Sequence, residues 1–385
     1  MHVAVLGGYG TVGRALVMDL LKSPDISLVT VAGRRQEKGR KLLEEYGEDK
    51  LAFSPIDLET DDVSELLHKA DLVVNAASPR FNLMIMNRAV KERTHYLDLA
   101  GMFTVAARQL ELHPKFVEAG LTAVLCMGCC PGLSNVLAKK LADSLDRTEE
   151  VHIRVGSRRG PDFKGFNLSP KIQLEEFTRK PIVYENGRFK ELEPLAGRGT
   201  HVFGDPIGEA EGFYAIHSEV LFLSRSIEGV ERVTYWVAFP EETLRKMDAL
   251  IEWGLTSTEP LRVKGISLSP REFLDAFLER IEPVSGYVEE HKALQVEARG
   301  TRNGLGTTLC LETVVGSNRE LDLTSSAYWA GVPASVVCQM IARGEIDRPG
   351  VFAPESIVEA GRLLEELRIK GIEVKDISSK QSTGS

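Results

Sequence analysis

The chain has 385 residues, of which 43% are hydrophobic and 27% charged, with a formal net charge of -9. This length suits two domains, and the composition is that of an ordinary globular protein with sizeable cores. The negative charge, with basic residues scattered along the chain, argues against nucleic acid or an anionic membrane as a partner. No stretch resembles a transmembrane span, and the first residues read as a strand without the basic start of a signal peptide. We therefore expect a cytoplasmic protein.

The five cysteines do not suggest a disulfide framework, because the count is odd and three of them crowd at Cys126, Cys129 and Cys130. Cys126 and Cys129 form a C-x-x-C pair, but no second pair or nearby histidine pair completes a zinc site. We expect no metal site here, and small residues at a strand end are the simpler interpretation.

The first predicted strand runs into a glycine-rich motif and then an amphipathic helix: Gly7-Gly8-Tyr9-Gly10-Thr11-Val12-Gly13. In this G-x-G-x-x-G pattern Gly8 is expected to permit the tight turn, Gly10 the approach of a pyrophosphate, and Gly13 close packing of helix and strand. The helix N-terminus would then face the anion. The pattern predicts a dinucleotide site; the alternative is a glycine-rich turn without a ligand.

The second predicted strand ends at Gly33-Arg34-Arg35, where NAD-binding chains carry an acid for the ribose hydroxyl. Arginines can instead bind a 2′-phosphate, which favours NADP over NAD. The alternative is that Arg34 and Arg35 only begin a solvated helix. We also assign to the cofactor site three residues near other strand ends: Asp57, Ala76 and Ala77.

Six apolar runs alternate with helical patterns in the first third of the chain: 3–7, 28–32, 51–55, 72–77, 96–99 and 123–127. Continuous runs of this kind are typical of strands buried on both faces of a parallel sheet. The pattern predicts a Rossmann-type, doubly wound α/β domain. Its ligands should lie beyond the carboxyl ends of the strands.

The middle of the chain predicts a second, α+β domain with a mainly antiparallel sheet. Strand-like runs occur at 151–155, 181–184, 232–239 and 294–298, with hairpin turns at Asn186-Gly187 and Asn303-Gly304. We expect helices at 241–253 and 270–281 to cover one face of this sheet. Further helices are predicted at 333–343 and 354–367.

The chain resembles the saccharopine dehydrogenase family, which includes saccharopine reductases, lysine 6-dehydrogenases and carboxynorspermidine dehydrogenases. The similar segments are the glycine-rich motif, 96–101, 128–135, 331–334, 344–346 and 349–355. The resemblance implies a dinucleotide-binding domain at 1–129 completed by 326–377, and a substrate and dimerisation domain at 130–325. It also implies hydride transfer between nicotinamide and a carbon that bears nitrogen, with an amino acid or related amine as substrate.

Two departures affect the expected substrate. Cys130 stands where saccharopine reductases tend to carry an acid before Pro-Gly, and the segment 174–179 is similar to the lysine 6-dehydrogenase branch. The acids of this segment suit an amine better than a second dicarboxylate arm. The arginines after Gly33, however, depart from the NAD pattern of that branch. Lysine 6-dehydrogenase or saccharopine reductase chemistry is our main expectation, and a carboxynorspermidine dehydrogenase-like polyamine enzyme is the alternative.

Proton transfer is assigned to Asp98, at a predicted strand end, and to His217. Asp98 could instead cap the next helix, and His217 could be a hydrogen-bonded core residue. The substrate-binding candidates are Cys130, Asn135, Glu219, Arg158 and Arg159. Glu219 could hold an ammonium or pair with a surface arginine, and Asn135 could bind a carboxylate or sit in a helix first turn. Arg158 and Arg159 could clamp a carboxylate together or be solvated charges.

A homodimer is expected, because the open sheet of the middle domain has edges and an outer face that need cover. The resemblance implies the same. The alternative from another functional class is a non-catalytic, NADP-binding regulatory protein. The cysteine at position 130, where saccharopine reductases tend to carry an acid, is consistent with this alternative. A hydrolase fits poorly, since neither G-x-S-x-G nor H-E-x-x-H occurs.

Overall fold

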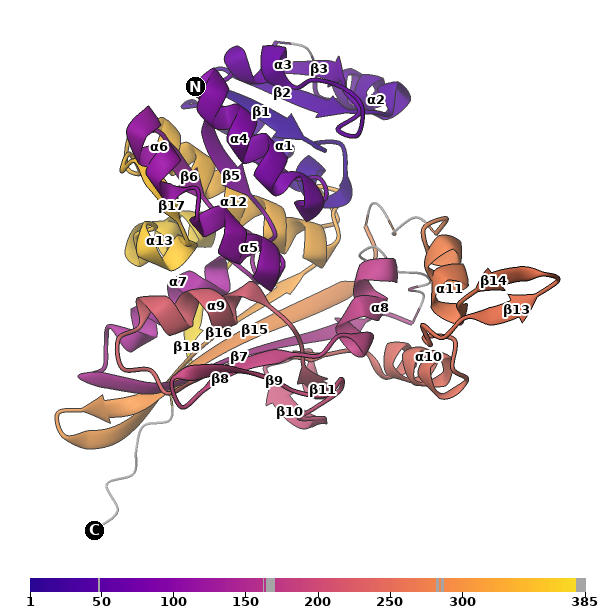
Figure 1. Cartoon of the computed structure of the whole chain (residues 1–385). Helices are drawn as coiled ribbons and strands as arrows, with labels where there is room; N and C mark the ends of the chain where they lie inside the picture. Colours follow the sequence, from indigo (N-terminus) through magenta and orange to yellow (C-terminus); the bar gives the residue numbers. More distant parts are fainter. Residues whose placement is uncertain (48, 162, 164–169, 282–283, 285–286, 379–385) are drawn as a thin grey trace.

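The computed structural model describes the whole chain except residues 48, 162, 164–169, 282–283, 285–286 and 379–385. Two sheets dominate it, one near each end of the molecule in the view of Figure 1. None of the helices in the described part is long and apolar enough to cross a membrane.

The first sheet is parallel throughout, in the order β17-β6-β5-β4-β1-β2-β3. Its strands are β1 (His2–Leu6), β2 (Leu28–Gly33), β3 (Leu51–Pro55), β4 (Leu72–Asn75), β5 (His95–Asp98), β6 (Thr122–Val124) and β17 (Gly350–Phe352). The six predicted strands are confirmed, and most of their Val, Leu and Ala side chains are buried, as a parallel sheet covered on both faces requires; the edge strand β3 is only half-buried. The seventh, β17, is too short to have a pattern of its own.

Helices cover both faces of this sheet (Figure 1). They are α1 (Thr11–Lys22), α2 (Gln36–Tyr46), α3 (Ser64–His68), α4 (Asn82–Glu92), α5 (Phe103–Leu110) and α6 (His113–Ala119), with the 3₁₀ turn η1 (Pro79–Phe81). The Rossmann-type prediction is therefore confirmed.

The end of the chain returns to this first part. Helix α12 (Ser325–Ala342) packs along α1, and Gly331 makes the close crossing possible because an added Cβ would lie 2.8 Å from Ala15 Cβ. After β17 come η2 (Pro354–Ser356) and α13 (Ala360–Ile369). The last strand, β18 (Lys375–Asp376), pairs instead with the second sheet, although the sequence places it with the first domain.

The second sheet is mixed and mainly antiparallel, in the order β10-β11-β12-β7-β15-β16-β18, with β8 pairing β12 and β9 beyond it. Its other strands are β7 (Arg147–Arg159), β8 (Ile182–Glu185), β9 (Arg188–Glu191), β10 (Gly199–Phe203), β11 (Gly208–Tyr214), β12 (Arg232–Ala238), β15 (Glu290–Arg302) and β16 (Leu305–Gly316). Both predicted hairpin turns form, with positive φ at Asn186, Gly187, Asn303 and Gly304. Among the strand pairs of this sheet that the structure describes, β12 and β7 alone run parallel.

The helices that cover this sheet differ from the prediction. Helices α7 (Leu133–Ala142) and α9 (Ser218–Ser226) lie on its inner face, between the two sheets, while α8 (Pro170–Thr178) lies toward one end. The predicted helices α10 (Glu241–Glu252) and α11 (Pro270–Leu278) do form, but they project from that end with the small β13–β14 hairpin (Leu261–Val263, Ile266–Leu268). Their amphipathic patterns identify an apolar face but not the element it packs against.

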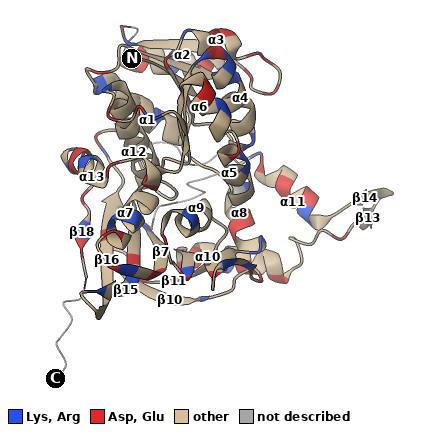
Figure 2. Cartoon of the chain, turned by 60° about the vertical axis from the view of Figure 1, so that its left-hand side comes forward, with Lys and Arg blue, Asp and Glu red and all other residues tan. Residues whose placement is uncertain are grey.

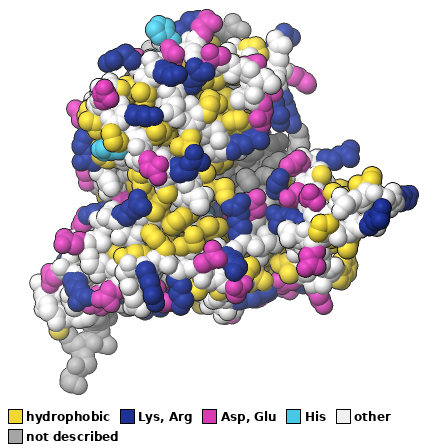
Figure 3. All heavy atoms as spheres, viewed as in Figure 1, with side chains coloured by type: hydrophobic (Ala, Val, Ile, Leu, Met, Phe, Trp, Pro, Cys, Tyr) yellow, Lys and Arg dark blue, Asp and Glu magenta, His cyan; other side chains and the backbone are white. Residues whose placement is uncertain are grey.

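Charged side chains of both signs alternate over the molecule (Figure 2). The face seen in Figure 3 shows the same mixture, with hydrophobic side chains gathered near the level where the two parts meet. The two catalytic candidates belong to different elements. Asp98 ends β5 of the first sheet, and His217 precedes α9, which lies on the inner face of the second sheet.

Candidate active site

The glycine-rich loop has the shape that a dinucleotide needs, with one change of role. Gly7, not Gly8, has the positive φ of +81°, and its N–H donates to Ala32 O at 2.7 Å. Gly8 is needed for packing, because an added Cβ would lie 2.8 Å from Val31 Cγ2. The assignment of the tight turn to Gly8 is therefore wrong, although both glycines are required.

The packing predicted for Gly13 is present, whereas the approach of a pyrophosphate to Gly10 stays a prediction. A Cβ on Gly13 would lie 2.4 Å from Gly7 O, so α1 can approach β1 only without a side chain there. A Cβ on Gly10, the N-cap of α1, would meet only Gly7 O at 3.1 Å, and no side chain caps the helix. The first-turn N–H groups, including those of Thr11 and Val12, lack partners within the helix and can bind a pyrophosphate.

Tyr9 closes the end of β2. A Cβ on Gly33 would lie 2.5 Å from the Tyr9 ring, and Tyr9 Oη accepts a hydrogen bond from Arg35 N at 3.0 Å. Arg34 and Arg35 are exposed, and Arg35 is the N-cap of α2. An acid at position 33 would collide with the ring, so the arginines are the residues that can meet a ribose substituent there.

The remaining cofactor candidates lie at the ends of neighbouring strands. A Cβ on Gly7 would lie 3.0 Å from Ala77 N and 3.1 Å from Ala76 O, so this backbone borders the glycine-rich loop. Asp57 follows the edge strand β3, and its Oδ1 accepts from Glu59 N at 3.1 Å. Asp57 therefore lies in a tight turn that follows the carboxyl end of β3, at the edge of the sheet where the cofactor is expected.

His217 and Glu219 form a close pair at the start of α9. His217 Nδ1 lies 2.7 Å from Glu219 Oε2, and the imidazole stacks on Tyr235 with ring centroids 3.8 Å apart. Glu219 is completely buried, whereas 18% of the His217 side chain is exposed. Burial alone would lower the pKa of His217, but the Glu219 carboxylate outweighs it and raises that pKa. The pair thus has a buried carboxylate and a partly exposed imidazole, an arrangement that a general base could use.

The buried side of this pair is anchored on α7. Ser134 Oγ donates to Glu219 Oε1 at 2.9 Å. Asn135 is a first-turn residue, because its Oδ1 accepts from Gly132 N at 3.1 Å, while its Nδ2 is buried without a hydrogen-bond partner in the described part of the chain. Glu355, on η2, accepts from Ser226 Oγ at 3.1 Å, and burial raises its pKa to about 7. The Ser134–Glu219 bond thus joins the start of α9 to α7, and the Ser226–Glu355 bond joins the end of α9 to η2.

Cys130 lies three residues before α7, the helix whose Ser134 binds Glu219. It is partly exposed, and its Sγ lies 3.8 Å from that of the buried Cys129. Burial raises the pKa of Tyr235, and charges at Cys130 and Glu219 raise it further. Cys130, Tyr235 and Glu219 thus share one electrostatic environment beside His217.

Asp98 is not on an open cleft wall. It is completely buried, and it accepts hydrogen bonds from Tyr96 Oη at 2.9 Å, Gln109 Nε2 at 2.6 Å and Cys126 N at 2.8 Å. It does not cap α5, whose N-cap is Met102. Burial raises the pKa of Asp98 to about 6, although its three donors oppose this. The placement favours a structural role, and proton transfer by Asp98 stays a prediction.

Replacing Asp98 by Asn is expected to destabilise the protein by about 1–3 kcal/mol, because the new amide would direct its own donor at donors that now bind a carboxylate. Cofactor affinity and kcat should stay within about twofold of the wild type. Thermal unfolding and steady-state kinetics of the purified variant measure both effects. A large fall in kcat at unchanged stability would instead assign Asp98 to the chemistry.

Arg158 and Arg159 cannot clamp one carboxylate together, since successive residues of a strand point to opposite faces. Arg158 is exposed and donates to Pro206 O at 2.7 Å. Arg159 lies on the inner face, where its Nη1 donates to Thr243 Oγ1 at 3.1 Å and its Nε lies 3.7 Å from Glu290 Oε1. The joint clamp is wrong because neighbours in sequence are separated by the sheet.

One residue of this region was missed from the sequence: Tyr235 on β12, whose ring stacks on that of His217. The alternation of strand 232–239 could have placed Tyr235 on the buried face with Val233 and Val237. No sequence signal brings it under His217, because that contact joins separate elements.

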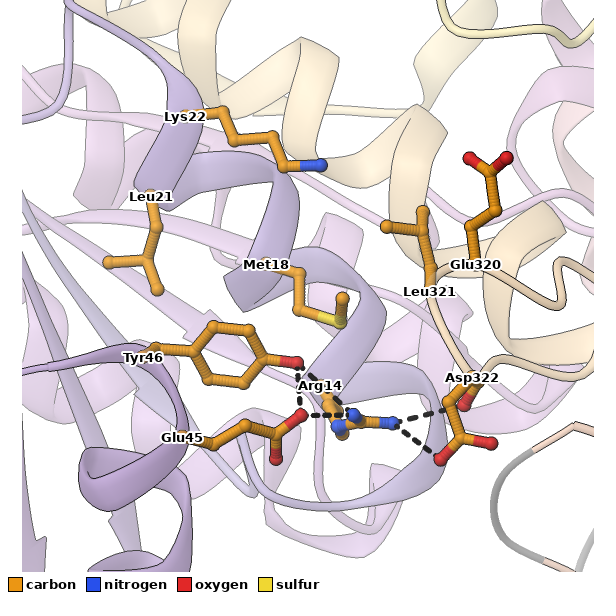
Figure 4. Close-up of a pocket in the computed structure, with 9 residues that line it drawn as sticks. All are labelled: Arg14, Met18, Leu21, Lys22, Glu45, Tyr46, Glu320, Leu321 and Asp322. Carbon is orange, nitrogen blue, oxygen red and sulfur yellow. Dashed lines mark hydrogen bonds and ion pairs between the residues drawn. The ribbon is translucent and has the colours of Figure 1, made fainter.

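Two hollows lie away from these residues. One, of about 380 Å³, lies between α1, α2 and the segment before α12 (Figure 4). Arg14 spans it, donating to Tyr46 Oη at 3.1 Å and to Asp322 O at 3.0 Å. The other, of about 390 Å³, lies on the outer face of the second sheet beside His152 and Arg232. Neither contains a residue predicted for the active site.

Comparison with known families agrees with this geometry. The saccharopine dehydrogenase NADP binding domain matches residues 3–124, and the saccharopine dehydrogenase C-terminal domain matches residues 128–372. The chain belongs to the saccharopine dehydrogenase family. It is therefore an oxidoreductase by family, and the match accounts for the nicotinamide-type loop and for the second sheet that carries Tyr235.

Two curated relatives are similar over most of their length. Carboxyaminopropylagmatine dehydrogenase of Synechocystis sp. is 25% identical over 374 residues, covering 93% of both chains. Carboxynorspermidine synthase of Vibrio cholerae is 26% identical over 380 residues, covering 91% of both.

Solved structures show the same fold. Saccharopine dehydrogenase (L-Glu forming) of Saccharomyces cerevisiae has a TM-score of 0.76 at 18% identity and covers 98% of this chain and 99% of its own. Homospermidine synthase of Legionella pneumophila, in complex with NAD, has a TM-score of 0.71 at 13% identity, covering 100% of this chain and 94% of its own.

Proposed function

We propose that this protein is an NAD(P)-dependent dehydrogenase acting on the C–N bond of a carboxylated polyamine. The observation that carries the proposal is the buried His217–Glu219 pair over Tyr235, in a chain similar along nine-tenths of its length to relatives named for such amines. These names favour the polyamine alternative over lysine or saccharopine, which was the main expectation from the sequence.

Oxidation of an amine requires its nitrogen to lose a proton, so that the lone pair can form a C=N bond as hydride leaves the adjacent carbon. A bound nicotinamide supplies the hydride acceptor. His217 fits the base, because its Nδ1 faces Glu219 and its Nε2 has no hydrogen-bond partner in the described part of the chain. Glu219 then orients the ring and stabilises the imidazolium that forms.

The direct test compares oxidation of carboxynorspermidine, carboxyaminopropylagmatine, saccharopine and lysine by the purified protein with NAD or NADP. Formation of the reduced cofactor is expected with at least one of the two carboxylated polyamines and to exceed that with lysine or saccharopine. Cofactor binding without turnover of any amine would instead support a non-catalytic, NADP-binding regulatory protein.

For the cofactor, we propose a preference for NADP, supported by the exposed Arg34 and Arg35 beside a Gly33 that Tyr9 leaves no room to replace. Replacing both arginines by Ala should erase most of the preference, since each charge-assisted contact contributes about 1.5–3 kcal/mol. Titrations of both cofactors into wild type and variant measure this. Equal wild-type affinities for NAD and NADP would contradict the proposal.

We further propose a homodimer formed through the second sheet, whose long strands β7 and β15 leave polar side chains on the outer face. Light scattering at micromolar concentration should return twice the chain mass of 42.5 kDa. A monomer would contradict it.

A further inference from the structure

Two neighbouring cysteines in the segment between β6 and α7 hold their sulfurs close together. The Sγ atoms of Cys129 and Cys130 lie 3.8 Å apart, and all five cysteines of the chain are free. A disulfide would require these two atoms to approach to about 2.05 Å. Neither sulfur takes part in the contact between His217 and Glu219.

The third cysteine of this segment belongs to a different hydrophobic core. Cys126 packs with the apolar side chains around β5 and β6, and an added Cβ on Gly101 would lie 2.5 Å from its Sγ. Cys129 belongs instead to the core that contains Leu133 of α7. The sulfur that meets Cys129 is therefore that of Cys130, and not that of its partner in the C-x-x-C pattern.

The two neighbouring thiols differ in their access to solvent. Cys130 is partly exposed, whereas Cys129 is only 4% exposed. Burial raises the pKa of the Cys129 thiol well above its ordinary value, and the adjacent Cys130 raises it further. A dissolved oxidant therefore meets Cys130 first, and Cys129 is placed to complete a bond with it.

The backbone of Cys129 supports the His217–Glu219 pair through α7. Cys129 O accepts a hydrogen bond from Ser134 N at 2.9 Å, and Ser134 Oγ donates to Glu219 Oε1 at 2.9 Å. Glu219 Oε2 lies 2.7 Å from His217 Nδ1. A movement of the Cys129 carbonyl therefore reaches His217 through Ser134 and Glu219.

A disulfide between adjacent residues is strained by its geometry. Consecutive Cα atoms lie about 3.8 Å apart across a trans peptide, whereas the usual separation across a disulfide is about 4.4–6.8 Å. Strain of this kind makes a disulfide easier to reduce. A bond between Cys129 and Cys130 would therefore form under oxidising conditions and open again when thiols are abundant.

We propose that Cys129 and Cys130 are a site of reversible oxidation, where a small-molecule disulfide such as oxidised glutathione converts the two thiols into a disulfide. The Cys130 thiol loses its proton and attacks one sulfur of the oxidant, which releases one half as a thiolate and leaves a mixed disulfide. The Cys129 thiol then loses its proton and attacks the Cys130 sulfur, which releases the other half. Two protein thiols are thus oxidised, and one oxidant molecule is reduced to two thiols.

The closed ring also changes the start of α7. Bringing the two sulfurs together twists the peptide between Cys129 and Cys130, and the Cys129 carbonyl turns away from Ser134 N. The support of Glu219 is weakened by the same movement. This consequence belongs to the oxidised protein whatever its substrate, so it does not rest on the proposed function.

The test incubates the fully reduced protein with oxidised glutathione and maps its disulfides by peptide mass spectrometry. We expect a peptide with Cys129 and Cys130 that has lost two hydrogen atoms. The thiols titrated in denaturant should fall from five to three, and dithiothreitol should restore all five. Five thiols that stay free, a glutathione retained on Cys130, or a bond between Cys126 and Cys129 would each overturn the proposal.

Hydrogen exchange measures the effect on α7. In the oxidised protein the amide of Ser134 should exchange about tenfold faster or more, because it has lost its acceptor, while α1 should exchange as in the reduced protein. Equal exchange at Ser134 in both forms would overturn the link from the disulfide to Glu219.

Cys126→Ala is the matched control, because it removes the other possible partner of Cys129. It should lose two of its four thiols under the same oxidant, whereas Cys130→Ala should keep all four, and thermal unfolding should show that both variants are folded. A disulfide that still forms in Cys130→Ala, or that fails to form in folded Cys126→Ala, would contradict the assignment. If Cys126→Ala does not fold, the peptide map of the wild type decides between the two pairs.

Discussion

Replacement of His217 by Gln is expected to lower kcat by about 10²- to 10⁴-fold, the usual contribution of a positioned general base. Gln keeps much of the size and the hydrogen bond to Glu219 but cannot take the amine proton. Cofactor affinity should stay near that of wild type, because the glycine-rich loop lies on another element. Steady-state kinetics and cofactor titration together measure this split.

The pH profile gives an independent check. In the oxidation direction the neutral imidazole is the base, so kcat should rise with pH through the pKa of His217. Burial lowers that pKa, and the Glu219 carboxylate raises it above its ordinary value of 6.5. In Glu219→Gln burial remains and the carboxylate is lost, so the rise should move to lower pH as kcat falls. An unchanged profile in Glu219→Gln, or full turnover in His217→Gln, would remove the pair from the mechanism.

A Cβ added at Gly13 is expected to damage folding and cofactor binding together. In Gly13→Ala the new atom would lie 2.4 Å from Gly7 O and 2.8 Å from Gly8 Cα, both of them backbone atoms that no rotamer change can move. Overpacking of this kind costs about 1–3 kcal/mol. Moving α1 away from β1 would also displace the helix N-terminus from the pyrophosphate, so we expect about tenfold or greater loss of cofactor affinity.

Gly199→Ala is the control for this change. Gly199 lies on β10, with nothing within 4 Å of an added Cβ and no left-handed φ. Thermal unfolding and cofactor titration should therefore match wild type in Gly199→Ala and not in Gly13→Ala. If Gly13→Ala bound cofactor normally, the loop would not be the pyrophosphate site.

Local patterns determined much of the fold. The runs of Val, Leu and Ala predicted six parallel strands because a strand buried on both faces must be apolar throughout, and the structure buries most of these side chains, those of the edge strand β3 least. Asn186-Gly187 and Asn303-Gly304 predicted hairpins because such turns need positive φ, which all four residues adopt. The glycine-rich motif likewise predicted a turn between strand and helix from the backbone freedom of glycine. Only the structure shows that Gly7, rather than Gly8, has the positive φ of this turn.

The active site depended on contacts that no local pattern encodes. His217 and Glu219 are two residues apart, so their pairing was within reach of sequence reasoning, whereas the Tyr235 ring beneath them comes from a different strand. A polar residue at a strand end can face solvent or the interior. Asp98 faces the interior, where Tyr96, Gln109 and Cys126 donate hydrogen bonds to its carboxylate. Arg158 and Arg159 are neighbours in one strand, so their side chains point to opposite faces of the sheet and cannot bind one carboxylate together.

The sequence by itself determined the parallel sheet and the glycine-rich loop, because each rests on periodicity or on backbone freedom within a short segment. The family was indicated by the resemblance of several short segments to the saccharopine dehydrogenase family. Tertiary structure alone decided which helices cover the second sheet, which acids are buried, and which side chains meet across α7, α9 and β12. Those outcomes depend on burial and on distances between remote segments, and the electrostatic cost of a charge is set by everything packed around it.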